Sequence, residues 1–296
     1  MEQEKYDPVA DQLIESLKRE LNAKLQKLEE IFEADVIFFY GQIQNGMDYG
    51  YRAFIEHLKQ DEKKNNKLVI LINTPGGSVE TVEKFVNINK HFYEEVYFVV
   101  PDIAMSAGTV FCLSGDKIFM DYSSSLGPID PQVFNGKQFV PALGYLDKVN
   151  EFVVKSQNNS LSQAELMLLQ QNDLAFLRLC EQHRDLTITL IKEWLVKYKF
   201  KNWTVHSSNG ATVTENEKIT RAQQIAQKLG DNTVWHSHGR CIDIRKLNKM
   251  GLKIDDYSDN KEMKEAIRTY NNLVLSYIWK MNLPTFFHSR NYVKKG

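Results

Sequence analysis

The chain has 296 residues, of which 43% are hydrophobic and 25% charged, and its formal net charge at pH 7 is −1. These proportions are typical of a folded globular protein, and 7 prolines and 15 glycines are too few for a fibrous or disordered one. A net charge near zero provides no general attraction to nucleic acid or to an acidic membrane surface. A binding partner must therefore be sought in local motifs.

Cysteine usage and hydropathy indicate the cellular compartment. Cys112, Cys180 and Cys241 are widely spaced and form no Cys-x-x-Cys pair, which fits reduced thiols better than a disulfide framework. The first 18 residues are polar and charged, and no stretch approaches the roughly 18 consecutive apolar residues that a membrane-spanning helix needs. We therefore expect a cytoplasmic protein with no membrane insertion.

The first predicted element is an amphipathic helix over residues 7–32. Its apolar residues, from Leu13 to Phe32, recur at steps of three and four between charged residues. A helix of this kind packs against its own domain or against another subunit. We treat residues 1–34 as an N-terminal helical unit.

Residues 35–120 alternate between apolar runs and helical patterns. Strands are predicted at 36–40, 68–72, 96–100 and 117–120, with helices at 49–63 and 79–92 and another ending at 113. Strands that are apolar throughout and separated by helices belong to a parallel sheet covered on both faces. Further helices are predicted near 143–156, 161–199, 214–229, 242–250 and 260–281.

Two turns of small residues each follow a predicted strand and open a helix. The first is Thr-Pro-Gly-Gly-Ser at 74–78, and the second, at 104–108, places Ser106 between alanines and a glycine. Alone, a serine in such a turn is most simply a helix N-cap, but a nucleophile elbow has the same pattern. If the two strands are neighbours, the N–H groups of Gly77 and Ala107 can converge on one oxygen beside Ser106 Oγ. That geometry is an oxyanion hole.

Three ordered motifs carry a family resemblance. Thr-Pro-Gly-Gly at 74–77, Ala-Met-Ser-Ala-Gly-Thr at 104–109 and Ser-Leu-Gly-Pro-Ile-Asp-Pro-Gln at 125–132 resemble the serine dehydrogenase proteinase family. That family is related to signal peptide peptidase A, the NfeD-type peptidases and the Clp proteolytic subunit. The resemblance, which runs from about residue 35 to 252, implies an α/β fold, a crotonase/Clp-protease-like spiral of βαβ units. N-terminal and C-terminal helices are added, so we expect a peptidase domain over 35–257 and a helical extension over 258–296.

A serine nucleophile needs a base to take its proton. No histidine occurs between His91 and His183, so the Clp-type histidine, about 25 residues after the serine, is absent unless a distant histidine folds back. In the Ser-Lys relatives the base is a lysine some forty to fifty residues after the serine. Lys148, 42 positions after Ser106, lies in a segment that resembles theirs. The resemblance thus implies a Ser106–Lys148 dyad, with Lys155 or a lysine of another subunit as alternatives.

Supporting residues are assigned on the same basis. Gly76 lets the backbone approach a ligand closely, and the resemblance implies that Ser125 either orients the lysine or is an ordinary loop hydroxyl. Asp130 is most simply a turn residue, although it could also line the cleft or contact a neighbouring subunit.

A metal site is the weaker interpretation of two nearby histidines. His236 and His238 form a His-x-His sequence, but only Cys241 and Asp243 among metal-ligand residue types lie close by in sequence. A cleft-lining role for His236 is the other possibility that the pattern allows. We expect neither a metal nor a cofactor.

The resemblance implies a soluble, ATP-independent serine endopeptidase. Ser106 would attack a peptide or protein substrate, and the protein would be a homo-oligomer that binds no nucleic acid. The alternative is a non-catalytic peptide-binding scaffold, which requires Lys148 to point away from Ser106. Acyl-CoA chemistry of the crotonase type is disfavoured by the serine in the turn and the Gly-Pro-Ile-Asp-Pro loop, and serine dehydratase activity by the lack of a segment resembling a pyridoxal phosphate anchor.

Overall fold

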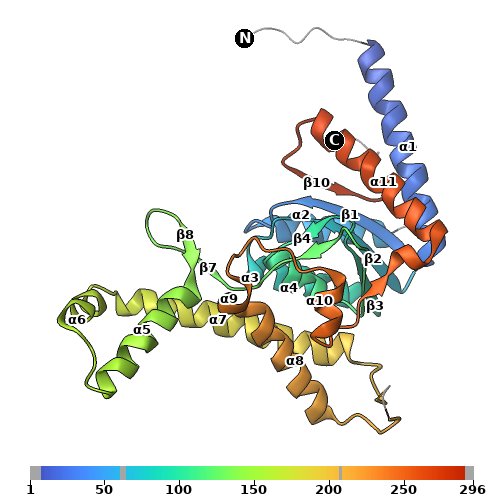
Figure 1. The fold of residues 1–296 in the computed structure, drawn as a ribbon. Helices are drawn as coiled ribbons and strands as arrows, with labels where there is room; N and C mark the ends of the chain where they lie inside the picture. The colour runs from blue at the N-terminus through green and yellow to red at the C-terminus, as the bar shows by residue number, and fades with distance from the viewer. Residues whose placement is uncertain (1–7, 61–64, 207–208, 291–296) are drawn as a thin grey trace, which may run out of the picture.

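The computed structural model describes residues 8–60, 65–206 and 209–290 (Figure 1). The helices are α1 (Pro8–Phe32), α2 (Met47–Lys59), α3 (Val79–Phe92), α4 (Ala107–Leu113), α5 (Ala142–Gln157), α6 (Gln163–Gln170), α7 (Leu174–Trp194), α8 (Glu215–Gly230), α9 (Asn232–Trp235), α10 (Ile244–Lys249) and α11 (Lys261–Lys280). A π-helical turn (Leu195–Lys199) continues α7, and a 3-10 turn (Tyr257–Asp259) precedes α11.

The strands are β1 (Asp35–Gly41), β2 (Lys67–Asn73), β3 (Glu95–Val99), β4 (Ile103–Ala104), β5 (Lys117–Met120), β6 (Ser125–Leu126), β7 (Gln132–Phe134), β8 (Phe139–Pro141), β9 (Asp255–Asp256) and β10 (Thr285–His288). The strands and helices predicted over residues 35–120 are confirmed, with ends shifted by a few residues. The helix predicted over 161–199 is instead divided, because Ser162 caps α6 and the Asp173 side chain accepts from Ala175 N–H at the start of α7.

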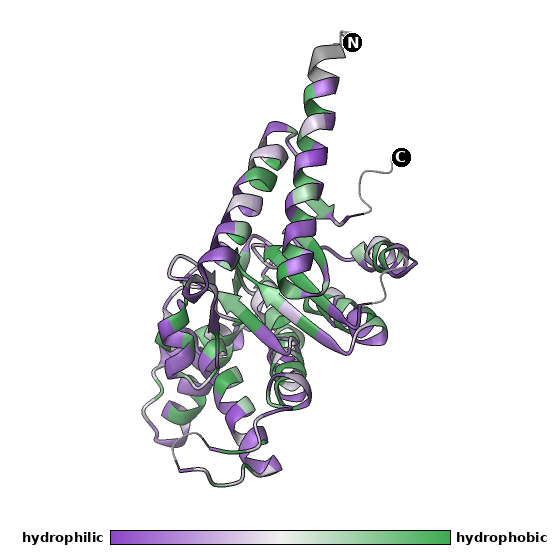
Figure 2. Ribbon diagram, turned by 90° about the vertical axis from the view of Figure 1, so that its right-hand side faces the viewer, coloured by the Kyte–Doolittle hydropathy of each residue, from purple (hydrophilic) through white to green (hydrophobic). Residues whose placement is uncertain are grey.

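A six-stranded sheet in the order β10-β1-β2-β3-β5-β9 forms the centre of the fold. All its neighbours are parallel except β10, which is antiparallel to β1. Alternate side chains enter two cores: Val36 and Phe38 pack with α1 and α11, while Ile37 and Phe39 pack with α2, α3 and α4. Figure 2 shows the apolar strands enclosed by helices whose outer faces are hydrophilic. The predicted α/β class with a parallel sheet is confirmed.

An arm projects from this layered body (Figure 1). It consists of the β7–β8 hairpin, α5, α6 and the first part of α7, and its small core contains Val133, Ala142 and Cys180. The rest of α7 returns to the body, where Leu190 and Ile191 join the main core. No helix within the ranges given above is both long enough and apolar enough to cross a bilayer.

The C-terminal segment completes the sheet as well as supplying helix α11. His288 of β10 is buried, and its Nδ1 lies 2.7 Å from the Tyr270 hydroxyl of α11, while Nε2 lies 2.8 Å from Asn22 Oδ1 of α1. Burial lowers the pKa of His288 from 6.5 to about 3. The imidazole is therefore neutral at pH 7 and links three elements through hydrogen bonds.

This buried histidine predicts an acid-sensitive fold. In the unfolded chain His288 binds a proton below pH ~6.5, whereas the folded chain resists protonation. Stability is therefore fully present above pH ~6.5 and is lost as the pH falls toward the folded pKa. We expect the free energy of unfolding, measured with urea, to be about 2 kcal/mol lower at pH 5 than at pH 7. The variant His288→Gln should show a flatter profile, and an unchanged slope would contradict the assignment.

Candidate active site

Ser106 occupies a strained turn between β4 and α4. Its φ of 52° and ψ of −119° lie outside the regions that residues with a side chain normally adopt. A conformation of this kind costs about 1–3 kcal/mol and is concentrated at functional sites. Although Ser106 directly precedes α4, its side chain makes no capping hydrogen bond. The N-cap interpretation therefore does not explain this serine, whereas a nucleophile elbow does.

The glycine turn lies directly against the serine turn. Thr74 N–H donates to the Ile103 carbonyl (3.1 Å), and Met105 N–H donates to the Thr74 carbonyl (3.0 Å), so the end of β2 pairs with β4. Gly76 follows with a φ of 106°, and a Cβ atom there would lie 2.6 Å from the Met105 carbonyl oxygen and 2.8 Å from Ser106 Cβ. Only glycine allows this approach.

Two backbone N–H groups beside Ser106 are free to bind an anion. Ile43 N–H donates to the Gly76 carbonyl (2.8 Å), and Ser78 N–H donates to the Ile43 carbonyl (2.9 Å), which leaves the intervening Gly77 N–H without a partner in this pairing. Neither Gly77 N–H nor Ala107 N–H has an acceptor among the residues that the structure describes. Both residues line the cavity that contains Ser106. This arrangement suits the stabilisation of an oxyanion.

The cavity has a volume of about 990 Å³ and brings together four residues expected from the sequence: Ser106, Gly76, Gly77 and Ala107. It is also lined by residues that the sequence analysis did not place there, namely Gln132, Phe139, His183, Thr187 and His238. These additional residues come from the β7–β8 hairpin, from α7 and from the segment after α9.

One buried carboxylate pairs with a histidine in this cavity. Asp130, whose side chain is 1% exposed, has Oδ1 2.8 Å from His238 Nδ1, and its Oδ2 accepts from Gln132 Nε2 at 2.8 Å. Asp130 is thus more than a turn residue. The pair could not be predicted from the sequence, because its members are 108 positions apart and no local spacing marks such a contact.

The two histidines of the His-x-His sequence have different surroundings. His238 faces Asp130 and the cavity, whereas His236 is exposed and has a left-handed φ of 62°. Within the part of the chain that the structure covers, no three His, Cys, Asp or Glu side chains are placed to hold a metal ion.

Lys148 does not line the Ser106 cavity. It lies on α5, is 61% exposed and forms an ion pair with Glu151 at 2.7 Å. It lines a different cavity of about 560 Å³, on the arm. Lys155 is paired with Glu165 at 2.6 Å, and this hydrogen bond raises its pKa, which makes it a poor base. Ser125 is buried in β6 and is absent from the lining of both cavities.

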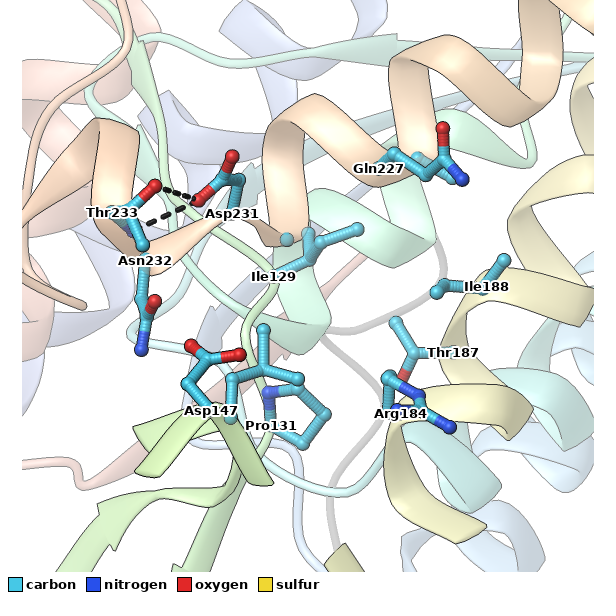
Figure 3. Close-up of a pocket in the computed structure, with 13 residues that line it drawn as sticks. Ile129, Pro131, Asp147, Arg184, Thr187, Ile188, Gln227, Asp231, Asn232 and Thr233 are labelled. Atoms are coloured by element: carbon cyan, nitrogen blue, oxygen red, sulfur yellow. Dashed lines mark hydrogen bonds between the residues drawn. The ribbon is translucent and has the colours of Figure 1, made fainter. Parts of the chain in front are cut away.

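A second cavity of about 510 Å³ adjoins the first and shares Ile129, Pro131 and Thr187 with it. Figure 3 shows Thr187 and Ile188 projecting from α7 toward Ile129 and Pro131. The lining is mostly uncharged, with Asp147, Arg184 and Asp231 as its charged members. Such a pocket next to a nucleophile is suited to hold a substrate side chain.

The contact between the two turns predicts the effect of one methyl group. In Gly76→Ala the new Cβ pushes against Ser106 Cβ, and a displacement of about 1 Å can lower reactivity about 100-fold. We therefore expect the rate at which Ser106 reacts with a fluorophosphonate to fall about 100-fold. Mass spectrometry of the labelled protein over time measures this rate.

The matched control for this variant is Gly46→Ala. Gly46 also has a positive φ, of 87°, but a Cβ there would meet nothing within 4 Å. Both variants bear backbone strain from a positive φ, which for the left-handed Gly46 is about 1–2 kcal/mol, and only Gly76→Ala disturbs the serine. Equal reactivity of the two variants would contradict the assigned close contact.

Two curated proteins of Methanocaldococcus jannaschii, both uncharacterized, are similar to this chain. MJ0137 is 40% identical over 70 residues, which are 24% of this chain and 24% of that protein. MJ1495 is 25% identical over 186 residues, which are 63% of this chain and 51% of that protein. The matched region thus spans about half the length of the longer-matching relative and a quarter of the other.

Solved structures with some similarity include two variants of the 1510-N membrane-bound stomatin-specific protease. The first has a TM-score of 0.44 and 15% identity, covering 78% of this chain and 81% of that one. The second, in complex with a substrate peptide, has a TM-score of 0.43, 15% identity and coverage of 78% of each chain. ClpP1 from Listeria monocytogenes has a TM-score of 0.43 and 14% identity, covering 81% of this chain and 95% of its own.

The family itself is established by a direct match. The model of the ClpP-like SDH-type serine proteinases matches residues 58–220, more than half of the chain. This range contains both turns of the candidate site, and the predicted resemblance is confirmed. The chain belongs to the ClpP-like SDH-type serine proteinase family.

Proposed function

We propose that this protein is a serine peptidase in which Ser106 attacks the substrate carbonyl and forms an acyl-enzyme. The main support is the strained turn at Ser106, whose hydroxyl caps no helix and which shares a cavity with two free N–H groups. Gly77 and Ala107 would hold the oxyanion of the tetrahedral intermediate. Removing one such donor typically costs about 3 kcal/mol of transition-state stabilisation.

The shape of the site favours a peptide over a small compact substrate. The Ser106 cavity adjoins the second cavity, and Ile129, Pro131 and Thr187 line both. A peptide could lie along the first cavity while one side chain enters the second. We propose peptides or unfolded protein segments as substrates, with no cofactor in the reaction.

The Ser106–Lys148 dyad remains a prediction from the sequence. Because Lys148 is paired with Glu151 and lines another cavity, it could serve Ser106 only through movement of α5 or from a second copy of the chain. The arm exposes apolar side chains that a second copy could cover: Phe134, Phe139, Leu166, Met167 and Leu168. We propose a homo-oligomer on this basis.

The non-catalytic scaffold is the second candidate function. The position of Lys148 outside the Ser106 cavity favours it, because this is the arrangement that a chain without a base would have. Strain at Ser106 argues against it, since a binding scaffold has no need of a strained serine. The two candidates differ in whether Ser106 is activated.

The reactivity of Ser106 tests the proposal. We expect a fluorophosphonate to label the wild-type protein at Ser106 and to leave Ser106→Ala unlabelled, as measured by intact mass and peptide mapping. Ser78→Ala is the matched control, because Ser78 lines the same cavity but caps α3 through Thr81 N–H. It should lose about 1 kcal/mol of stability and keep its labelling. Equal labelling of wild type and Ser106→Ala would support the scaffold instead.

A further inference from the structure

The second cavity, of about 510 Å³, adjoins the cavity that contains Ser106. Its volume lies in the range of about 300–1,000 Å³ that is usual for small-ligand sites. Because Ile129, Pro131 and Thr187 line both cavities, a substrate held at Ser106 has one side chain close to the second cavity. The lining of that cavity decides which kind of side chain fits.

The walls of the second cavity are mostly apolar. They are formed by Ile129 and Pro131 in the segment after β6, Leu143 on α5, Ile188 on α7 and Ala226 on α8. Walls of this kind suit a side chain with a long hydrocarbon stem, even where that side chain ends in a charged group.

Asp147 brings an unpartnered carboxylate to this apolar lining. It lies on α5 and is exposed, and its side chain forms no hydrogen bond or ion pair with any residue that the structure describes. Figure 3 shows the carboxylate beside Pro131 and beneath Ile129 in that view. A carboxylate placed here can accept hydrogen bonds from a cation that enters the cavity.

Two cations in the neighbourhood of Asp147 are paired with other carboxylates. Arg184, which lines the same cavity from α7, has Nε 2.9 Å from Asp185 Oδ1. Lys148, which follows Asp147 in the sequence, has Nζ 2.7 Å from Glu151 Oε2 and lines another cavity. Since neither cation forms an ion pair with Asp147, the charge of this carboxylate is left for a ligand.

The second acidic residue of the lining adds to the negative charge. Asp231 caps α9, and its Oδ1 accepts from the N–H and the hydroxyl of Thr233 at 2.9 and 2.6 Å (Figure 3). These hydrogen bonds are made within the chain, but the charge of Asp231 remains. Two carboxylates and one guanidinium therefore line the cavity, which favours a cation over an anion.

We propose that the second cavity binds a basic side chain of the substrate, lysine or arginine, and that Asp147 determines this preference. This inference rests on the proposed reaction at Ser106. The apolar walls contact the hydrocarbon stem, and the terminal ammonium or guanidinium group donates to the Asp147 carboxylate. The substrate class is then a peptide with a basic residue close to the bond that is cleaved.

Competition between peptides and a fluorophosphonate for Ser106 tests this preference. The peptides are acetyl-Ala-Ala-X-Ala-Ala-amide, with X as lysine, norleucine or glutamate. Norleucine has nearly the same stem as lysine but no charge. We expect the lysine peptide to halve the labelling rate at a concentration about 10-fold lower than the norleucine peptide, because a hydrogen bond to a charged group is worth about this factor or more. The glutamate peptide should compete least.

Asp147→Asn keeps the shape of the side chain and removes its charge. Because Asp147 is exposed and its carboxylate has no partner to lose, we expect this variant to fold and its lysine and norleucine peptides to compete at similar concentrations. This ratio compares two peptides on one variant, so it does not depend on the variant's overall reactivity. The matched control is Glu181→Gln. Glu181 is a carboxylate of α7 that is paired with Arg178 at 2.7 Å and lines none of the cavities described above, so this variant should keep the preference for lysine.

The outcomes separate this inference from the proposed function. Labelling that requires Ser106, with equal competition by the lysine and norleucine peptides, overturns the inference alone. Stronger competition by the glutamate peptide also overturns it, in favour of Arg184 as the charged partner of the substrate. A preference for lysine that persists in Asp147→Asn overturns the role of Asp147, whereas its loss there and its retention in Glu181→Gln support that role.

A protein that the fluorophosphonate does not label at Ser106 contradicts the proposed reaction. Binding of the same peptides, measured by isothermal titration calorimetry, then still tests the second cavity. Tighter binding of the lysine peptide that is lost in Asp147→Asn supports a site for basic side chains in a non-catalytic scaffold. Equal binding of the lysine and norleucine peptides overturns the inference together with the proposed function.

Discussion

The site depends on the contact between two backbone turns that is possible only because Gly76 has no side chain. Its backbone lies where a Cβ would be 2.8 Å from Ser106 Cβ, so the ends of β2 and β4 meet at one point of the sheet edge. Ser106 has its strained φ at this contact, and the two free N–H groups belong to Gly77 and Ala107, the residues that directly follow the two contacting ones. Strain of about 1–3 kcal/mol persists only where the surroundings over-determine it, and here the β2–β4 hydrogen bonds and the packed α4 do so.

The Thr109 side chain links the turn that contains Ser106 to a distant part of the chain. Its hydroxyl joins α4 to Gly127, and the nearby residues Leu126 and Ile129 pair with Ile242 and Leu229, a hundred or more positions away. A buried hydroxyl with partners on both sides is costly to leave unsatisfied, at about 1–3 kcal/mol. The segment that leads to Asp130 is therefore hydrogen-bonded to the Ser106 turn, whereas His238 lies in a largely exposed loop.

What the sequence could predict was what is local. Strands and helices over residues 35–120 follow from apolar periodicity, and Gly76, Gly77, Ser106 and Ala107 follow from small residues placed after strands. The partner of Asp130 could not be predicted in this way, because a contact across 108 positions is set by the packing of α8, α9 and β6. The position of Lys148 could not be predicted for the same reason. The arm that carries α5 projects from the body, and helical periodicity does not indicate the direction in which a helix runs. Strand β10 was missed because it is short and follows a long helix.

The burial of Asp130 requires that both of its carboxylate oxygens have hydrogen-bond partners. Withdrawing a carboxylate from water costs several kcal/mol unless its oxygens are hydrogen-bonded, and a turn can be formed by an exposed aspartate at no such cost. Here each oxygen has its own partner, His238 on Oδ1 and Gln132 on Oδ2. Because the Gln132 amide satisfies the second oxygen, the first is left to orient one imidazole in one direction. The buried carboxylate therefore fixes the position of the His238 ring at the edge of the Ser106 cavity.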